Sequence, residues 1–333
     1  MRGWAFPLLS TALFASFLSS VFLGSVRVPP SDVLMYLLGW RGEVHVFDVV
    51  VDMRLVRGVA AVLTGASLGV AGAVLQSLFR NPLADPFVLG ISSGSSLAIA
   101  LTLVAGLGAG LIQAYDPYAL YMAAAAGAAL TSLAVVIFST IAKTAIGLIL
   151  AGVMLGYLNA GLTTLLVTLS PVETMRAFSF WTLGTFSAAK WSLVEPVLPL
   201  FAVGLVASLL VAKPLNALAF GEEVAASMGA WVRGARVAAV AASSAVVALA
   251  TVVAGPIGFI GLAAPHVARL LAKSVDNRVV IPLSGLAGAT LSITADIAAR
   301  NIMPPLDLPL TAITSLFGAP IILLLLLRGG KWG

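Results

Sequence analysis

Long apolar runs separated by short polar breaks repeat along the whole chain. A helix needs about 20 apolar residues to cross a hydrocarbon core roughly 30 Å thick, and its backbone must satisfy its own hydrogen bonds there. A β-barrel would instead alternate apolar and polar residues, which stretches such as 240–254 do not do. The pattern predicts an all-α, polytopic integral membrane protein with a single transmembrane domain over 1–333. Its ten expected helices lie at 4–26, 55–79, 88–110, 118–141, 145–169, 193–212, 235–253, 257–271, 279–298 and 308–327.

Two of these runs differ from an ordinary membrane span. The first follows Arg2 and could be a cleavable signal peptide, but it is long for one and no small-residue cleavage motif follows it. We interpret it as a retained helix. The run at 257–271 is short for a full span. Small residues spaced four apart, at Gly65 and Gly69 and at Gly152 and Gly156, predict close helix packing, either within one bundle or across a dimer seam.

Two connections between runs are long. In the connection at 27–53, Ser31 or Asp32 could cap a short helix lying at the outer surface. The connection at 213–236 has a turn residue, Gly221, followed by two acidic residues and by apolar residues at helical spacing. This pattern predicts two short helices on the cytoplasmic face.

Charge is scarce and unevenly placed. Hydrophobic residues make up 60% of the chain and charged residues 9%, whereas soluble domains carry roughly 25% charged residues. Eleven of the 18 Lys and Arg residues fall on the side of the N-terminus, which predicts cytoplasmic N- and C-termini. We interpret the net charge of +5 as this orienting bias, and no basic patch predicts a nucleic-acid partner.

Few residues could perform chemistry. No lysine lies in a G-x-x-x-x-G-K-[ST] loop, so the chain is not expected to be an enzyme, and any ATP and Mg would bind to another subunit. The chain has no Cys, and His45 and His266 lack a second ligand at helical spacing, so no metal or cofactor site is expected. Asp296 either pairs with Arg300, four residues on, or serves as the coupling residue of an ion-driven secondary carrier.

Two stretches broken by Gly and Pro, 80–96 and 255–269, are the strongest signals. Such breaks are tolerated at membrane depth only against protein or a water-lined cavity, and in transporters they often flank the pathway. Alternatively, both are tight turns in which His266 and Arg269 act as local caps. The motif residues are Pro82, Asp85, Pro86, Gly90, Gly258, Pro265, His266 and Arg269.

The pair Arg-Asn-Pro-Leu-Ala-Asp-Pro at 80–86 and Gly-Pro-Ile-Gly-Phe-Ile-Gly-Leu-Ala-Ala-Pro-His-Val-Ala-Arg at 255–269 resembles the FecCD-type permeases. These import iron-siderophores, haem and cobalamin with ATP-binding-cassette (ABC) partners. The likeness spans nearly the whole chain and includes Met-Arg-Leu-Val-Arg at 53–57. It implies ten helices in a cell (plasma or inner) membrane and a homodimer with the pathway on the two-fold axis. It also implies cytoplasmic ABC ATPase subunits and an extracytoplasmic substrate-binding protein.

The resemblance also implies roles for individual residues. In the loop 213–236, the residues expected to couple to the ATPase are Leu218, Gly221, Glu222, Glu223, Ala226 and Gly229. Those matching the arginines that dock the binding protein are Arg54, Arg57 and Arg300. The cytoplasmic gate is expected at Asn81, Leu83, Lys143, Thr144 and Ala145, and the pathway helix at 145–169, with Leu150, Gly152, Met154, Gly156 and Asn159.

Each of these implied roles has a simpler alternative. The loop 213–236 could be a plain surface loop, and the arginines could snorkel at the interface or pair with Asp296. A pathway lined by Ala, Leu, Gly and Thr cannot select a metal by ligation. It suits a bulky chelate that passes intact and is selected by the binding protein.

Overall fold

The computed structural model describes residues 3–40, 45–108, 117–142 and 144–327, and every regular element in them is helical. Each of the ten predicted segments contains a helix. Seven helical spans are long and apolar enough to cross a membrane, and three apolar helices are shorter. The predicted all-α membrane bundle is therefore confirmed. The ten helices are α1 (Ala5–Phe22), α3 (His45–Leu78), α4 (Ile91–Gly108), α5 (Pro117–Ile141), α6 (Ala145–Thr168), α9 (Val197–Leu210), α12 (Val232–Ala254), α13 (Ile260–Ala272), α14 (Asn277–Asn301) and α15 (Leu310–Leu327).

The predicted start of the second segment, at residue 55, is wrong. Helix α3 has 34 residues, a length of about 51 Å at 1.5 Å per residue. The charged residues near 52–57 look like a boundary in sequence, but the fold satisfies them. Arg54 donates to the carbonyls of Val21 and Phe22, at 2.9 and 3.1 Å. Because these charges have partners, the helix continues through them.

Six shorter helices complete the fold: α2 (Pro30–Leu37), η1 (Pro86–Leu89), α7 (Val172–Thr182), α8 (Trp191–Val194), α10 (Ala212–Leu218) and α11 (Glu222–Ser227). The predicted short helix at 30–37 and the two predicted short helices in 213–236 are present. The predicted cap of α2 by Ser31 or Asp32 is wrong, because Pro29 holds the N-cap position without a side-chain bond and Pro30 opens the helix. Helices α7 and α8 were not predicted.

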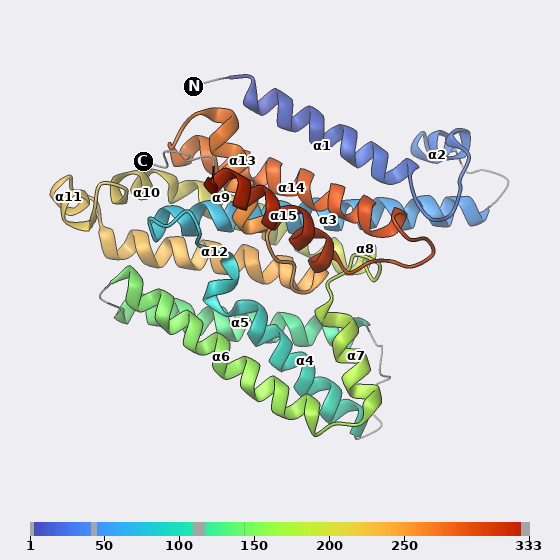
Figure 1. Ribbon diagram of the computed structural model, residues 1–333, viewed down its shortest axis with the longest axis horizontal. Helices are drawn as coiled ribbons and strands as arrows, with labels where there is room; N and C mark the ends of the chain where they lie inside the picture. Colours follow the sequence, from blue (N-terminus) through green and yellow to red (C-terminus); the bar gives the residue numbers. More distant parts are fainter. Residues whose placement is uncertain (1–2, 41–44, 109–116, 143, 328–333) are drawn as a thin grey trace.

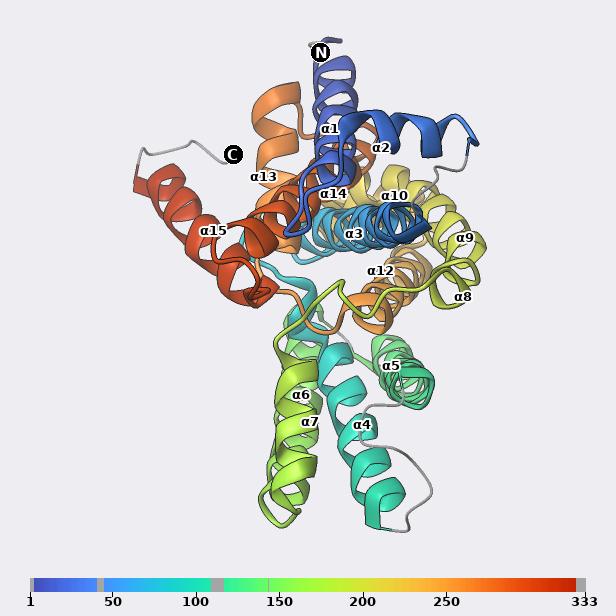
Figure 2. The same cartoon turned by 90° about the vertical axis from the view of Figure 1, so that its right-hand side faces the viewer.

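The helices form two groups (Figures 1 and 2). Helices α4 to α7 pack together in the lower half of Figure 2, and the other long helices surround α3 above them. Helix α12 packs against both α3 and α5 and joins the groups. At the centre, a β-carbon on Gly65 or Gly69 would overlap the backbone carbonyls of Gly288 or Ser284 in α14. This glycine pair therefore packs within one protomer.

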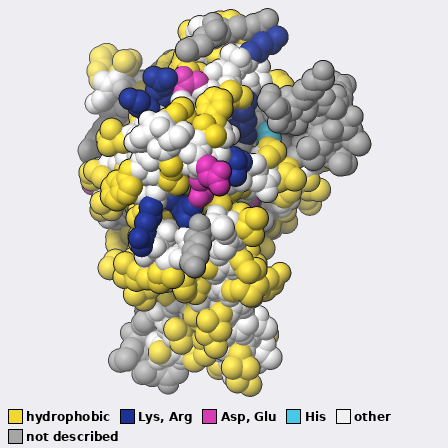
Figure 3. Space-filling model, turned by 90° about the vertical axis from the view of Figure 1, so that its left-hand side faces the viewer, with side chains coloured by type: hydrophobic (Ala, Val, Ile, Leu, Met, Phe, Trp, Pro, Cys, Tyr) yellow, Lys and Arg dark blue, Asp and Glu magenta, His cyan; other side chains and the backbone are white. Residues whose placement is uncertain are grey.

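The bundle has two ends, which we name after a short helix at each. The α11 end holds α10 and α11, the C-terminal ends of α3 and α5, and the starts of α6, α12 and α14. The α8 end holds α2, α8 and the start of α3. Helix α1 begins and α15 finishes at the α11 end (Figure 1). Figure 3 shows the α11 end face-on, with several Lys and Arg side chains and fewer acidic ones.

Candidate functional site

Each broken stretch interrupts the α-helices, between α3 and α4 in the first and between α12 and α13 in the second. In the first, Asp85 caps η1 by accepting a 2.8 Å hydrogen bond from the Phe87 amide, and Gly90 (φ 72°) turns the chain into α4. In the second, Gly255 (φ 73°) ends α12, and Phe259 also has a positive φ (69°) just before α13. Phe259 pays a steric cost there that glycine would not.

The two broken stretches touch each other. Pro86 packs against Gly261, where an added β-carbon would lie 2.5 Å from the proline ring. The imidazole of His266, a residue only 3% exposed, donates to the backbone carbonyl of Pro82. His266 therefore links the two stretches instead of capping its own turn. Pro265 lies buried inside α13, and Gly258 has open space around it.

A second link joins the later stretch to α3. The Arg269 guanidinium donates to the side-chain oxygen of Gln76, and the Gln76 amide donates to the Leu262 carbonyl at 3.3 Å. Gly72, one turn earlier on α3, lies against the carbonyl of Gly261. Pro265 cannot donate to that carbonyl, which would be its helical partner, so the close approach of α3 covers a backbone group that the proline leaves free.

The predicted gate residues lie at the α11 end. Asn81 and Leu83 are exposed, and the Asn81 side chain accepts a 2.9 Å hydrogen bond from the Leu83 amide. Thr144 caps α6 by accepting a 3.1 Å bond from the Gly147 amide, and Ala145 is half-buried. Lys143 lies outside the described residues.

The predicted pathway residues divide between two faces of α6. Gly152 and Gly156 lie close to the backbone of the first broken stretch at Val88–Gly90, and Asn159 donates to the Ser93 hydroxyl at 3.4 Å. These three residues therefore pack within the protomer. Leu150 and Met154 are exposed, at 57% and 52%. Only this second face is open to lipid, to a pathway or to a second copy.

The residues predicted to couple to the ATPase also divide. Gly221 (φ 108°) and Gly229 (φ 81°) flank α11 in conformations that favour glycine. Leu218 is only 5% exposed and belongs to the main apolar core, so it packs α10 onto the bundle and offers no surface to a partner. Glu222 pairs with Arg236. Glu223, Ala226 and Gly229 are exposed.

The three predicted docking arginines are held inside a polar cluster at the α8 end. Arg57 contacts both Asp296 and Asp307 at 2.8 Å, and Asp296 is fully buried. Arg300 lies 3.4 Å from Asp296, which confirms the predicted pair, and donates to the Ser20 carbonyl at 2.7 Å. Burial raises the pKa of Asp307, but hydrogen bonds from Ser187 and Arg57 outweigh it and hold that pKa below its ordinary value.

A cavity of about 590 Å³ opens beside this cluster and is lined by all three arginines and by Asp52, Lys190 and Asp307. Sequence reasoning missed Asp307 and Ser187, since their contacts with Arg57 span more than 100 residues. Arg54 is 5% exposed and donates only to carbonyls at the end of α1 and just after it. It fastens α1 to α3, and of the three arginines only Arg57 keeps partial exposure, at 14% of its side chain.

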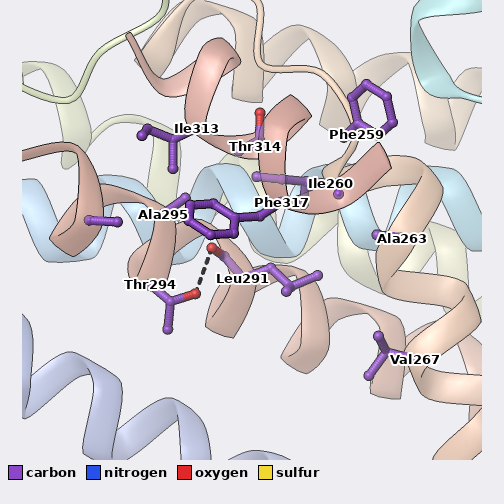
Figure 4. A pocket seen from close by; sticks show the side chains of 12 residues that line it. Phe259, Ile260, Ala263, Val267, Leu291, Thr294, Ala295, Ile313, Thr314 and Phe317 are labelled. Carbon is purple, nitrogen blue, oxygen red and sulfur yellow. Dashed lines mark hydrogen bonds between the residues drawn. The ribbon is translucent and has the colours of Figure 1, made fainter. Parts of the chain in front are cut away.

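A second cavity, of about 310 Å³, lies between α13, α14 and α15 (Figure 4). Phe259, Ile260 and Phe317 contribute to its apolar lining. Its two hydroxyls belong to Thr294, which donates to the Leu291 carbonyl, and Thr314. A lining of this kind offers no ligand to a metal ion. Elsewhere in the described residues, no group of three or more His, Cys, Asp or Glu side chains could hold a metal.

The sequence and fold match one family throughout. The model of the FecCD transport family matches residues 12–328. The chain belongs to the FecCD transport family. It is 35% identical to the uncharacterized ABC transporter permease protein YvrB of Bacillus subtilis (strain 168), over 96% of this chain and 92% of that protein. It is 34% identical to the vitamin B12 import system permease protein BtuC of Escherichia coli, over 97% and 94%.

A solved structure described as an inward-facing conformation of an ABC transporter of the metal-chelate type superposes with a TM-score of 0.84. It is 27% identical and matches over 98% of this chain and 100% of that one. The fold of a FecCD permease is therefore shown along essentially the whole chain. FecCD members are membrane subunits of transporters and not catalytic enzymes.

Proposed function

We propose that this chain is the permease subunit of an ATP-driven importer for a metal chelate or corrinoid, such as an iron-siderophore, haem or cobalamin. One observation carries the proposal. The two broken stretches meet inside a FecCD bundle, through Pro86 on Gly261 and His266 on Pro82, and the first of them also packs on α6. Broken backbone buried against helices is the arrangement that transporters use around a pathway.

The two ends of the bundle fit different partners. The basic α11 end lies in the cytoplasm, by the rule that cytoplasmic loops carry the excess of Lys and Arg. The exposed side of α11 there receives ATPase subunits, which bind ATP and Mg. The α8 end, with its polar cavity, receives the binding protein outside the plasma or inner membrane. Two copies of the chain form the pathway between them.

Substrate chemistry follows from the lining residues. The exposed face of α6 carries Leu150 and Met154 and no carboxylate or imidazole. A single thioether, from Met154, is too few ligands to strip a metal from its chelate. The chelate therefore passes whole, and the binding protein selects it.

The test is uptake into proteoliposomes that contain this chain and its cognate ATPase, with the cognate binding protein and radiolabelled cobalamin or a ferric siderophore as probes. We expect accumulation of one probe that requires ATP, the ATPase and the binding protein together. Uptake that persists without the ATPase would show that the proposed function is wrong.

The second candidate is an ion-coupled carrier that uses Asp296. The structure favours a static role for this residue, because Asp296 is fully buried between Arg57 and Arg300. Breaking a buried ion pair typically costs about 3–5 kcal/mol. We expect Asp296→Asn to lower the thermal unfolding midpoint in detergent, while an imposed proton or sodium gradient drives no uptake even in the unmodified chain. Gradient-driven uptake abolished by Asp296→Asn would favour the carrier instead.

A further inference from the structure

Arg236, near the start of α12, joins two segments at the α11 end. Its Nη2 atom donates to Glu222 Oε1 at 2.5 Å, and its Nη1 atom donates to the Ala142 carbonyl at 2.8 Å. Glu222 is the first residue of α11, and Ala142 directly follows α5. The Arg236 side chain is 6% exposed, so this single guanidinium connects both segments from within the protein.

The two contacts need an arginine. A guanidinium presents donors in a fixed planar fork and can hold a carboxylate and a carbonyl at the same time, whereas a lysine ammonium is a compact point charge. Arg233, on the same helix, differs in this respect, since its side chain is exposed and donates to the Thr140 carbonyl at 2.6 Å. Both arginines satisfy carbonyls at the end of α5, where a helix has no partners of its own.

Each of the two joined segments leads to a different part of the machinery. Helix α11 anchors itself in the core through Ala225, which is fully buried, and exposes Glu223 and Val224 on its other side. The segment after Ala142 leads through the cap residue Thr144 into α6. The helix that a partner would contact and the segment that leads into the pathway helix are therefore both bonded to one buried cation, the Arg236 guanidinium.

We propose that Arg236 is a positioning residue that transmits displacement of α11 to the α5–α6 connection. The proposal rests on the proposed function, in which α11 receives the ATPase and the α5–α6 connection forms part of the gate. Leaving a buried charge without its partner is strongly unfavourable. When α11 moves, Arg236 therefore follows Glu222, and the Ala142 carbonyl on the same guanidinium moves with it.

Helix α10 gives this linkage a fixed support. The Asn216 side chain donates to Asp276 at 2.6 Å and accepts from the backbone and side-chain nitrogens of Asn277, both at 2.9 Å. Asn277 in turn accepts from the Ser77 hydroxyl at 2.5 Å. Because α10 is tied to α14 and α3, a push on α11 turns it about Gly221 instead of shifting the whole loop.

The experiment uses the absence of Cys from the chain. A single cysteine at Ile146, which is 78% exposed in the first turn of α6, reports on the α5–α6 connection through its rate of labelling by a water-soluble thiol reagent. The full complex with the cognate ATPase is labelled with and without MgATP. We expect MgATP to change the labelling rate. In Arg236→Lys we expect the ratio of the rates with and without MgATP to move about tenfold closer to one, as for loss of one charge-assisted hydrogen bond.

Arg233→Lys is the matched control, because an ammonium can keep its single carbonyl contact, and we expect it to leave the dependence unchanged. If Arg236→Lys does not fold, Glu222→Gln, altered at the more exposed partner of the pair, decides in its place. When both variants fold, we expect the double variant to lose no more of the MgATP dependence of labelling than Arg236→Lys alone, since the two residues act as one unit.

Three results would overturn the proposal: a labelling rate insensitive to MgATP in a complex that imports, an unchanged dependence in Glu222→Gln or Arg236→Lys, or independent losses that multiply in the double variant. These differ from a failure of the proposed function, which would be uptake by the unmodified complex that does not need the ATPase.

Discussion

Gly72 lies where α3 crosses α13, and the absence of a side chain lets the two backbones touch. A β-carbon there would overlap the carbonyl oxygen of Gly261. Overpacking a core typically costs about 1–3 kcal/mol, and a clash with backbone cannot be relieved by a rotamer change. We therefore expect Gly72→Ala to lower the free energy of unfolding by roughly 3 kcal/mol. The loss would be measured as a lower thermal unfolding midpoint in detergent. Gly161→Ala is the control, since Gly161 on α6 has nothing within 4 Å of the added carbon; equal midpoints would contradict the packing.

Docking by the arginines of the α8 end is testable one residue at a time. Arg57 keeps partial exposure beside the polar cavity, whereas Arg54 is committed to carbonyls near α1. We expect Arg57→Glu to weaken capture of the binding protein, by about tenfold if one charge-assisted contact is lost, measured by surface plasmon resonance. The exposed Arg27 lies between α1 and α2, at the same end of the bundle, so Arg27→Glu controls for a general change of charge. Equal weakening by both variants would show that Arg57 has no specific role.

Among contacts between side chains, the sequence predicts only those between residues that are close along the chain. Asp296 and Arg300 lie four residues apart on one helix, and that spacing is sufficient to predict their pairing. Arg57 reaches Asp296 and Asp307 only because α3 and α14 pack side by side. His266 looks like a local cap for the same reason, since its partner Pro82 belongs to a stretch that is distant in sequence.

Helix α14 begins with a cap that also holds α10. Asp276 is its N-cap, and its carboxylate accepts bonds from the Arg278 amide at 3.0 Å and the Asn216 side chain at 2.6 Å. We expect Asp276→Ala to lower the free energy of unfolding by about 1 kcal/mol, the usual value for losing an N-cap. Asp276→Asn retains a capping oxygen and should cost less. Thermal unfolding of the two variants in detergent measures the difference, and equal losses would contradict the capping role.

The same residue gives a pH dependence with a definite sign. The hydrogen bond from Asn216, followed by that from the Arg278 amide, lowers the pKa of Asp276 in the folded protein. A group whose folded pKa is depressed stabilises the protein above its unfolded pKa, near 4, and that contribution is lost as the pH falls through the folded value. We expect the unfolding midpoint to fall less steeply on acidification in Asp276→Asn. If the unfolding midpoints of the two proteins fell in parallel on acidification, this linkage would be contradicted.

Most of the helices could be predicted, because an apolar run of about 20 residues has few alternatives in a bilayer. Boundaries were less predictable. Helix α3 starts ten residues before the predicted boundary, since the charges at 52–57 acquire partners only in the folded bundle. Helix α7 was missed because its sequence mixes Glu173 and Arg176 with aromatic residues and lacks a long apolar run.

The whole molecule is expected to be half of a symmetric pair. On α6, Leu150, Met154 and Leu158 are spaced four residues apart and are 57%, 52% and 59% exposed, so they form one apolar stripe. The opposite face of α6 is already occupied by the first broken stretch through Gly152. If the pathway lies on a two-fold axis beside α6, residues of this stripe approach their own copies in the second protomer, as isologous symmetry requires.

The chain has no Cys, so single cysteines can test this arrangement in native membranes. A disulfide forms only when the two Cα atoms come within about 7 Å. We expect oxidation to give a dimer band for cysteine at one or more of Leu150, Met154 and Leu158. Val203 and Leu210 on α9 are even more exposed, at 67% and 74%. Cysteine at either position should stay monomeric because lipid covers that helix. Cross-linking through α9 and not α6 would place the axis on the other side of the bundle and remove α6 from the pathway.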